Sequence, residues 1–152
     1  MSLLQIDKLS LDIDGVQILR DVSLRLDAGR ILGVIGESGS GKSMTAFAVT
    51  QLLPVGVTCR GRVLLQGQDV LAQTEAQMCQ LRGRVVSMVF QEPMTALNPL
   101  HPIGQQVAET IMVHENIGRT AAMARAAQAL RRAELPPETF PMGRYPHELS
   151  GG

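Results

Sequence analysis

Several residue types that mark particular classes of protein are scarce in this chain of 152 residues. Its two cysteines, Cys59 and Cys79, are too few for a disulfide framework, and we expect both to be reduced thiols. The 14 basic and 14 acidic residues cancel, so nothing in the charge suggests nucleic acid as a partner. No apolar run approaches the roughly 20 residues that span a bilayer. We therefore expect that this polypeptide does not itself cross a membrane.

Aromatic residues are also rare. They make up 3% of the chain against 45% hydrophobic residues, so a core must be built from aliphatic side chains. Asp7 and Lys8 interrupt the first apolar stretch, which argues against a secretory signal. The three histidines lack the spacing of a metal site, and we expect them to be structural or solvated: His101, His114 and His147.

A glycine-rich segment is the most specific feature that the chain does contain. Residues 36–43, GESGSGKS, fit the pattern G-x-x-x-x-G-K-[ST] of a phosphate-binding loop. An apolar run at 31–35 precedes the loop, and a predicted helix runs from Lys42 to about Leu53, ending before Pro54. Strand, glycine loop and helix is the context in which the pattern binds phosphate, so the segment predicts a nucleoside triphosphate site.

The chemistry of triphosphate binding gives the loop residues their expected roles. Glycines let the backbone curl and aim its N–H groups inward, and the positive end of the helix adds to the attraction for phosphate. We expect Lys42 to reach the β- and γ-phosphates and the Ser43 hydroxyl to ligate Mg²⁺. The predicted ATP-binding residues are Gly36, Glu37, Ser38, Gly39, Ser40, Gly41, Lys42 and Ser43.

The first part of the chain has the pattern of an antiparallel sheet. Apolar and polar residues alternate over 3–13 and 16–26, on either side of the turn signal Asp14-Gly15. A second turn is expected at 28–30. A short strand at 62–65 is expected to join this hairpin, giving a small sheet against the nucleotide-binding core.

The pattern then changes to buried strand and helix. Continuous apolar runs at 31–35 and 85–90 predict strands of a sheet that is covered on both faces. A brief helix is expected at 75–81. Helical spacing begins at Ile103, and an alanine-rich helix is predicted at 121–133, within a helical region that reaches about Leu149.

Two further motifs follow the glycine loop in the order found in ATP-binding-cassette (ABC) ATPases. The segment 85–91, VVSMVFQ, resembles the strand and glutamine of that family's Q-loop, and 149–152, LSGG, matches the first four residues of its signature L-S-G-G-Q. The resemblance covers the whole chain, which corresponds to about the first half of such a domain. It implies an α/β fold: a P-loop NTPase (ABC ATPase) core with a small antiparallel β subdomain and an α-helical subdomain, incomplete at the C-terminus.

The resemblance also implies a division of the chain and a branch of the family. Residues 91–100, QEPMTALNPL, and 145–152, YPHELSGG, look like the peptide and nickel importer branch, and the amino-terminal segment looks most like nickel-import subunits. The implied regions are an antiparallel β subdomain at about 1–30 and 60–70, a P-loop core at 31–58 and 83–93, and a helical subdomain at 95–152.

Further site residues are carried over from the resembled family. Gln91 is the implied catalytic residue, positioning Mg²⁺ and the attacking water, and Mg²⁺ would be shared between Gln91 and Ser43. The loop Glu92-Pro93-Met94 would face membrane-spanning partners. The partial signature, which would contact ATP on a partner subunit, comprises Ser150, Gly151 and Gly152.

One position departs from the family pattern. An aromatic residue usually precedes the glycine of the first hairpin and stacks on adenine, but here Ile13 and Asp14 precede Gly15. Neither has a π-face, so binding should depend more on the phosphates and base discrimination should be weak. Ile13 and Val16 could still give apolar contact.

The leading hypothesis is an ATPase subunit that powers import of peptides or nickel, with ATP and Mg²⁺ as cofactors. Its implied partners are a second ABC ATPase subunit, membrane permeases and, indirectly, a substrate-binding protein, at the cytoplasmic face of a bacterial inner membrane. The acidic strand and catalytic glutamate of the family are missing from the 152 residues, so this polypeptide alone is expected not to hydrolyse ATP. The alternatives are a non-catalytic nucleotide-binding module or degenerate gene product, and a soluble ABC ATPase of DNA repair or translation.

Overall fold

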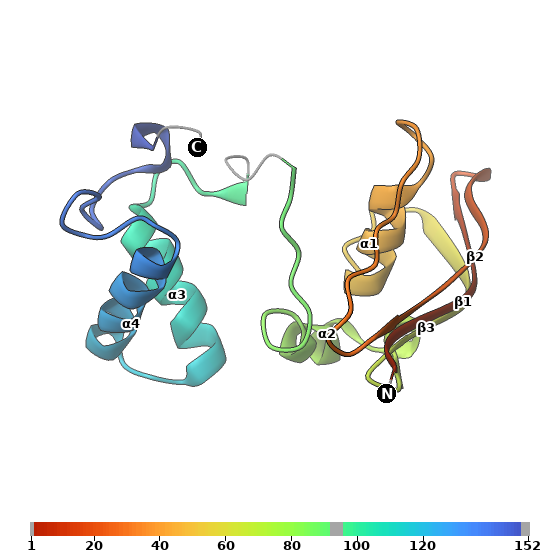
Figure 1. Cartoon of the computed structure of the whole chain (residues 1–152), viewed down its shortest axis with the longest axis horizontal. Helices are drawn as coiled ribbons and strands as arrows, with labels where there is room; N and C mark the ends of the chain where they lie inside the picture. Colours follow the sequence, from red (N-terminus) through yellow and green to blue (C-terminus); the bar gives the residue numbers. More distant parts are fainter. Residues whose placement is uncertain (1, 92–95, 150–152) are drawn as a thin grey trace. The chain divides into compact units, whose positions relative to one another are not determined.

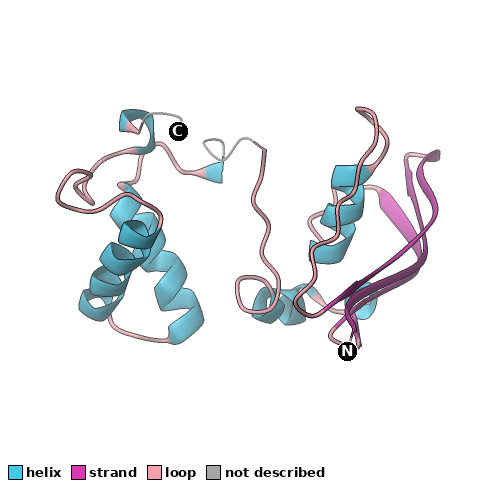
Figure 2. Cartoon of the chain, viewed as in Figure 1, coloured by secondary structure: helices cyan, strands magenta, loops and turns pink. Residues whose placement is uncertain are grey.

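The chain forms two compact units, Met1–Met88 and Val89–Gly152, in a computed structural model that describes residues 2–91 and 96–149. The first unit holds a β-sheet with helices beside it, and the second is helical (Figures 1 and 2).

The sheet of the first unit has four antiparallel strands in the order β2-β1-β3-β4. Its strands are β1 (Ser2–Ile13), β2 (Val16–Asp27), β3 (Val57–Leu65) and β4 (Gln68–Asp69). Asp14 and Gly15 both have positive φ angles, 48° and 81°, as a two-residue hairpin turn requires. The third strand is longer than the predicted 62–65, because β3 pairs with β1 all the way from Ile13↔Val57 to Leu4↔Leu65.

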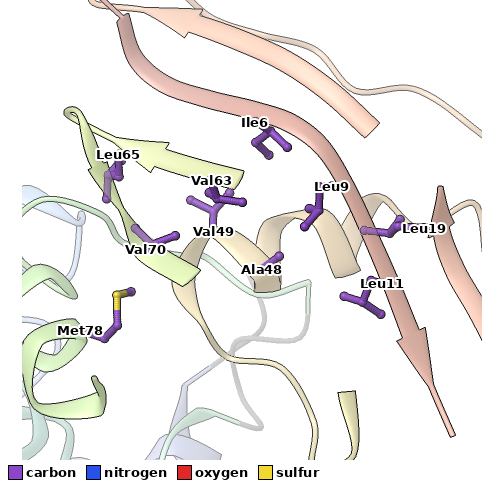
Figure 3. Packing of buried hydrophobic residues seen from close by; sticks show 10 residues of the cluster. All are labelled: Ile6, Leu9, Leu11, Leu19, Ala48, Val49, Val63, Leu65, Val70 and Met78. Atoms are coloured by element: carbon purple, nitrogen blue, oxygen red, sulfur yellow. The ribbon is translucent and has the colours of Figure 1, made fainter. Parts of the chain in front are cut away.

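The core of the first unit lies between the sheet and helix α1 (Lys42–Thr50), with the 3₁₀ helix η1 (Val70–Ala72) and α2 (Glu75–Leu81) beside them. Ala48 and Val49 of α1 pack against sheet residues (Figure 3). The core is aliphatic, as the composition predicted, and its buried members are Ile6, Leu9, Leu11, Leu19, Ala48, Val49, Val63, Leu65, Val70 and Met78. This packing fixes α1, and with it the residues at the start of that helix.

The two α-helices of this unit agree with their predicted ranges to different extents. Helix α1 stops at Thr50 instead of the predicted Leu53, because Gln51 adopts a left-handed conformation with φ 50°. Helix α2 spans the predicted residues, and a capping box between Thr74 and Gln77 starts it.

The predicted core strands at 31–35 and 85–90 are not strands in this structure. Ile31 and Ile35 are 100% and 97% exposed, and Val89 is 91% exposed. Around the second run, the structure has only an isolated parallel bridge between Arg82 and Val86. A strand exists through hydrogen bonds to a neighbour. Among residues 2–91 and 96–149, no strand pairs with either run. The two runs, whose sequences are typical of buried strands, are therefore extended and solvated.

The second unit contains the helices α3 (Ile103–Glu115) and α4 (Arg119–Arg132) and the 3₁₀ helix η3 (Pro146–Glu148). Helix α4 lies close to the predicted 121–133. Ala108, Ala122 and Ala126 are buried where α3 and α4 meet, and small side chains let the two helices approach closely.

Candidate functional site

The glycine-rich loop leads directly into helix α1. Residues 36–40 are exposed, and α1 begins with Lys42 immediately after Gly41. The ammonium group of Lys42 donates hydrogen bonds to the carbonyl oxygens of Gly36 and Glu37, at 2.8 and 2.6 Å, and to Ser40 Oγ at 3.2 Å. The loop therefore curls around the lysine nitrogen and presents oxygen atoms to it from its first two residues and from Ser40.

Gly41 allows the loop to pass close to the sheet. Its φ angle is +86°, a conformation that L side chains rarely adopt, and a Cβ atom would lie 2.3 Å from Leu19 Cδ2. Leu19 belongs to β2 and is 3% exposed within the core. The sheet therefore supports the loop from behind at the point where the helix begins. Sequence reasoning missed Leu19, which appears in the pattern only as one apolar residue of a strand.

The start of α1 has the electrostatics of an anion site. Its N-cap, Gly41, makes no side-chain cap, and the first turn contains no acidic residue. The first N–H groups of the helix thus point out with the positive end of the helix dipole, and no acidic residue of the first turn opposes it. Together with the Lys42 charge and the exposed loop, this donor set fits the phosphate groups of a nucleotide.

The groups available to a metal ion at this site are oxygens. Ser43 is exposed in the first turn of α1, so its hydroxyl can reach a ligand. No group of three or more His, Cys, Asp or Glu side chains that could hold a metal occurs among the described residues. Mg²⁺ favours few protein ligands supplemented by phosphate oxygens and water, and a serine hydroxyl beside a phosphate cradle fits that preference.

The other predicted site residues are less completely described. Gln91 is exposed and belongs to the second unit, and it is the last residue described before position 96. Glu92, Pro93 and Met94 lie outside the described residues, as do the signature residues Ser150, Gly151 and Gly152. Their roles stay predictions.

The position predicted to lack an adenine platform lies at the tip of the first hairpin. Ile13 pairs with Val16 across the turn, and Val16 is 63% exposed. Phe47 in α1 is the one aromatic residue among positions 1–88. The hairpin tip therefore offers aliphatic contact without a π-face.

Arg82 is a second residue that sequence reasoning missed. Its guanidinium donates to the carbonyl oxygens of Thr50 and Gln51 at the end of α1, at 2.8 and 3.1 Å. It also donates to both carboxylate oxygens of Glu75 in α2, at 2.6 and 3.1 Å. These bonds lower the pKa of the Glu75 carboxyl, chiefly through the hydrogen bond from Arg82, and raise that of Arg82. The arginine thus ties the far end of the loop-bearing helix to α2.

Among the residues that the structure describes, none of the helices is long and apolar enough to cross a membrane.

Comparison with solved structures identifies the fold that contains this site. The chain superposes on a solved dimeric ATP-binding cassette, MJ0796 bound to ADP and Pi, with a TM-score of 0.78 and 21% identity, covering 97% of this chain and 63% of that one. A second dimeric structure of MJ0796, described as a bacterial ABC transporter cassette, gives a TM-score of 0.76 at 20% identity, covering 97% and 63%. At this identity the likeness establishes the fold, a P-loop NTPase of the ABC type.

Curated relatives are similar over nearly the whole chain. The probable D,D-dipeptide transport ATP-binding protein DdpD of Escherichia coli is 47% identical, covering 98% of this chain and 47% of the relative. The oligopeptide transport ATP-binding protein OppD of Bacillus subtilis is 41% identical, covering 90% and 39%. The glutathione import ATP-binding protein GsiA of Salmonella choleraesuis is 42% identical, covering 90% and 23%. The chain thus spans about half or less of the length of these relatives.

A family profile described as ABC transporter matches residues 19–152, which include the loop, Gln91 and the partial signature. With that match, the cassette fold and the geometry around Lys42, the chain belongs to the ABC transporter ATP-binding family.

Proposed function

We propose that this chain belongs to an ATP-binding subunit that powers import of peptides or nickel through an ABC transporter. The observation that carries the proposal is the exposed loop around Lys42 at the unblocked start of α1. Binding of ATP and its hydrolysis are general properties of the family. The hydrogen bonds that Lys42 now gives to Gly36 and Glu37 would be exchanged for bonds to phosphate oxygens.

The protein groups divide the work at the nucleotide. Lys42 and the loop N–H groups neutralise and orient the phosphates, and Ser43 holds Mg²⁺. Bound Mg²⁺ would supply charge neutralisation between the phosphates. Gln91 would orient the attacking water, while Ser150, Gly151 and Gly152 would meet the ATP of a second subunit. None of the 152 residues supplies the acidic strand of the family, so we expect this polypeptide alone to bind ATP without turnover.

The names of the relatives favour peptides within the proposed substrate range. They refer to D,D-dipeptides, oligopeptides and glutathione, all of them peptides. Nickel import depends only on sequence resemblance, that of residues 91–100 and 145–152 to the peptide and nickel importer branch and that of the amino-terminal segment to nickel-import subunits. Peptide import is therefore the better-supported form of the proposal.

The proposed partners follow from the same comparisons. The cassette relatives MJ0796 were solved as dimers, which supports pairing with a second ABC ATPase subunit. The curated relatives are ATP-binding proteins of transport systems, which supports docking to membrane permeases and, indirectly, to a substrate-binding protein. We place the subunit at the cytoplasmic face of a bacterial inner membrane, attached through those permeases.

The test uses the only two lysines of the chain. Lys42→Ala removes the charge directed at the phosphates, so Mg·ATP affinity should fall at least tenfold, about 1.4 kcal/mol. Lys8→Ala, at an exposed position of β1, changes the net charge equally and should leave the affinity unaltered. Affinity is measured by titration with a fluorescent ATP analogue, and ATP turnover is followed alongside.

Equal ATP affinity for the unsubstituted chain and Lys42→Ala would contradict the assignment of Lys42 to the phosphate site. Turnover above the Lys42→Ala background would instead contradict the expectation that the 152 residues alone are inactive. A non-catalytic nucleotide-binding module remains the alternative function. This alternative predicts ATP binding without turnover even when the acidic strand of a relative is added to the chain.

A further inference from the structure

A side-chain amide of helix α3 holds residues 98–101, which come shortly before that helix in the chain. Gln106 Oε1 accepts a hydrogen bond from the Asn98 N–H at 2.9 Å, and Gln106 Nε2 donates to the Asn98 carbonyl at 2.9 Å. The same nitrogen donates to the His101 carbonyl at 2.8 Å. Both backbone groups of Asn98 are thus bonded to one side chain, as they would be to a neighbouring strand.

The chemistry of these partners fixes the orientation of the amide. A backbone N–H can bond only to the oxygen of the amide, and two carbonyls can bond only to its nitrogen. Glutamine satisfies this set, whereas a carboxylate or an apolar side chain of the same size does not.

Other hydrogen bonds extend from Asn98 along the segment. Asn98 Oδ1 accepts from the Leu100 N–H at 3.0 Å, and the Asn98 carbonyl also accepts from the His101 N–H at 3.2 Å. None of residues 96–101 is buried, and Leu100 is 80% exposed. Burial of apolar surface therefore does little to hold this segment, and its position depends on polar contacts that meet at Gln106.

The platform that carries Gln106 is itself fixed. The N–H groups of Ile103 and Gly104 donate to the carbonyls of Arg144 and Met142, at 2.8 and 2.9 Å. Gly104 permits this approach, because a Cβ atom there would lie 2.6 Å from Met142 Cβ. The start of α3 is therefore also anchored to Met142 and Arg144, which precede Leu149 in the chain.

The held segment forms one wall of a hollow. The residues that line it include Leu97 and His101 and, from α3, Val107 and Val113, around a space of about 570 Å³. Three hydrogen bonds to Gln106 join this wall to the helix.

We propose that Gln106 is a positioning residue, whose amide holds residues 98–101 against α3 and so keeps this hollow open. The importance of this role for transport rests on the proposed function, because the loop after Gln91 is the part expected to face membrane subunits. The positioning itself involves only contacts within the second unit.

The test compares two neighbouring glutamines in the 152-residue chain. Gln106→Glu keeps the size and the accepted bond but loses both donated bonds and places a negative charge beside two carbonyls. Exchange of the Asn98, Leu100 and His101 amides should become at least tenfold faster, while exchange within α4 stays unchanged. Gln105→Glu, at the exposed adjacent position, adds the same charge and should alter neither.

A pH series separates positioning from general damage to the fold. Below the pKa of the introduced carboxyl group, its protonated form can donate one hydrogen bond, so protection of residues 98–101 should partly return. Asn98→Ala is the second variant: it removes only the bond to the Leu100 N–H, so Leu100 should exchange faster while Asn98 and His101 amides stay protected.

Two results would overturn the proposal: unchanged protection of residues 98–101 in Gln106→Glu, or an equal loss in Gln105→Glu. Neither measurement needs nucleotide, so its outcome is independent of the Lys42 titration. If Lys42→Ala binds ATP normally, the proposed function fails while the positioning role of Gln106 is still decided by exchange.

Discussion

At the scale of single residues, the hairpin tip gives the nucleotide site its least usual property. Ile13 and Val16 pair across the turn where the family pattern places an aromatic platform, and both side chains are aliphatic. Aliphatic contact does not distinguish one purine from another, because it carries no directional hydrogen bond. Recognition is thus left mainly to the phosphate loop.

The first prediction is weak base selectivity. GTP should compete with a fluorescent ATP analogue within about tenfold of ATP, because both nucleotides offer the same triphosphate. Ile13→Tyr adds a stacking surface, and stacking of a base on an aromatic ring contributes about 1–3 kcal/mol. ATP affinity should therefore rise roughly tenfold.

Val113→Tyr is the control for this prediction, because it adds the same ring at a 78% exposed position of the second unit. A hundredfold preference of the unsubstituted chain for ATP would show that another group reads the base. An equal gain in Val113→Tyr would show that the added ring acts non-specifically.

At the scale of elements, the loop-bearing helix α1 is held at both ends by groups from elsewhere in the first unit. Leu19 of β2 lies against Gly41 at the start, and Arg82 bonds the last carbonyls, those of Thr50 and Gln51. A cation at a helix C-terminus also interacts favourably with the helix dipole. The position of Lys42 depends on both attachments.

The second prediction concerns Arg82. Arg82→Lys keeps the charge but cannot bond α1 and Glu75 together, because an ammonium lacks the planar fork. The first unit should lose on the order of 1–2 kcal/mol of stability in urea unfolding followed by circular dichroism. Arg20→Lys, at an exposed site of β2, should cost much less. Equal losses of stability for the two variants would contradict the role of Arg82 in joining α1 to Glu75.

The third prediction is the pH dependence of the same contact. The hydrogen bond from Arg82 lowers the pKa of Glu75 in the folded chain, so the contribution of the pair is present above the ordinary glutamate pKa. It is lost as the pH falls through the lowered value. Glu75→Gln should therefore be less stable than the unsubstituted chain at pH 7, by a small amount because Glu75 is solvated. The difference in stability should disappear once the pH is below the lowered pKa of Glu75, and a difference that persists in acid would argue against the pair.

At the scale of the whole molecule, the surface contains more large aliphatic side chains than a stable monomer usually exposes. Ile31, Ile35, Val55 and Val89 are each more than 90% exposed, and Val34 is 55% exposed. Burying one such side chain contributes about 1.5–3 kcal/mol, so covering the set is worth on the order of 10 kcal/mol. That is comparable to the net stability of a domain.

The fourth prediction is that the 152-residue chain associates or binds a hydrophobic dye unless another surface covers these residues. Ile31→Lys with Ile35→Lys should reduce association, measured by light scattering, while leaving the sheet intact by circular dichroism. Leu9→Lys, which places the same charge in the core, should unfold the sheet instead. A monomer that neither binds the dye nor scatters would show that this surface is stable in water.

The sequence by itself determined the features that depend on neighbours in the chain. The hairpin turn at Asp14-Gly15, the start of α1 at Lys42 and the capped helix α2 each follow from a few adjacent residues, and the structure confirms all three. The family resemblance is likewise a matter of residue order and spacing, and the comparisons confirm it. The roles of the site residues at nucleotide and Mg²⁺ stay predictions.

Only the tertiary structure decided which groups meet across the chain. Arg82 reaches Thr50, and Leu19 supports Gly41, through contacts between segments that no local pattern relates. The apolar runs at 31–35 and 85–90 were misassigned for the same reason. Their composition indicates burial, but a strand is defined by a ladder of hydrogen bonds to a neighbouring strand, and neither run pairs with a strand within the described chain. Local sequence sets what a segment can form, whereas its partners decide what it does form.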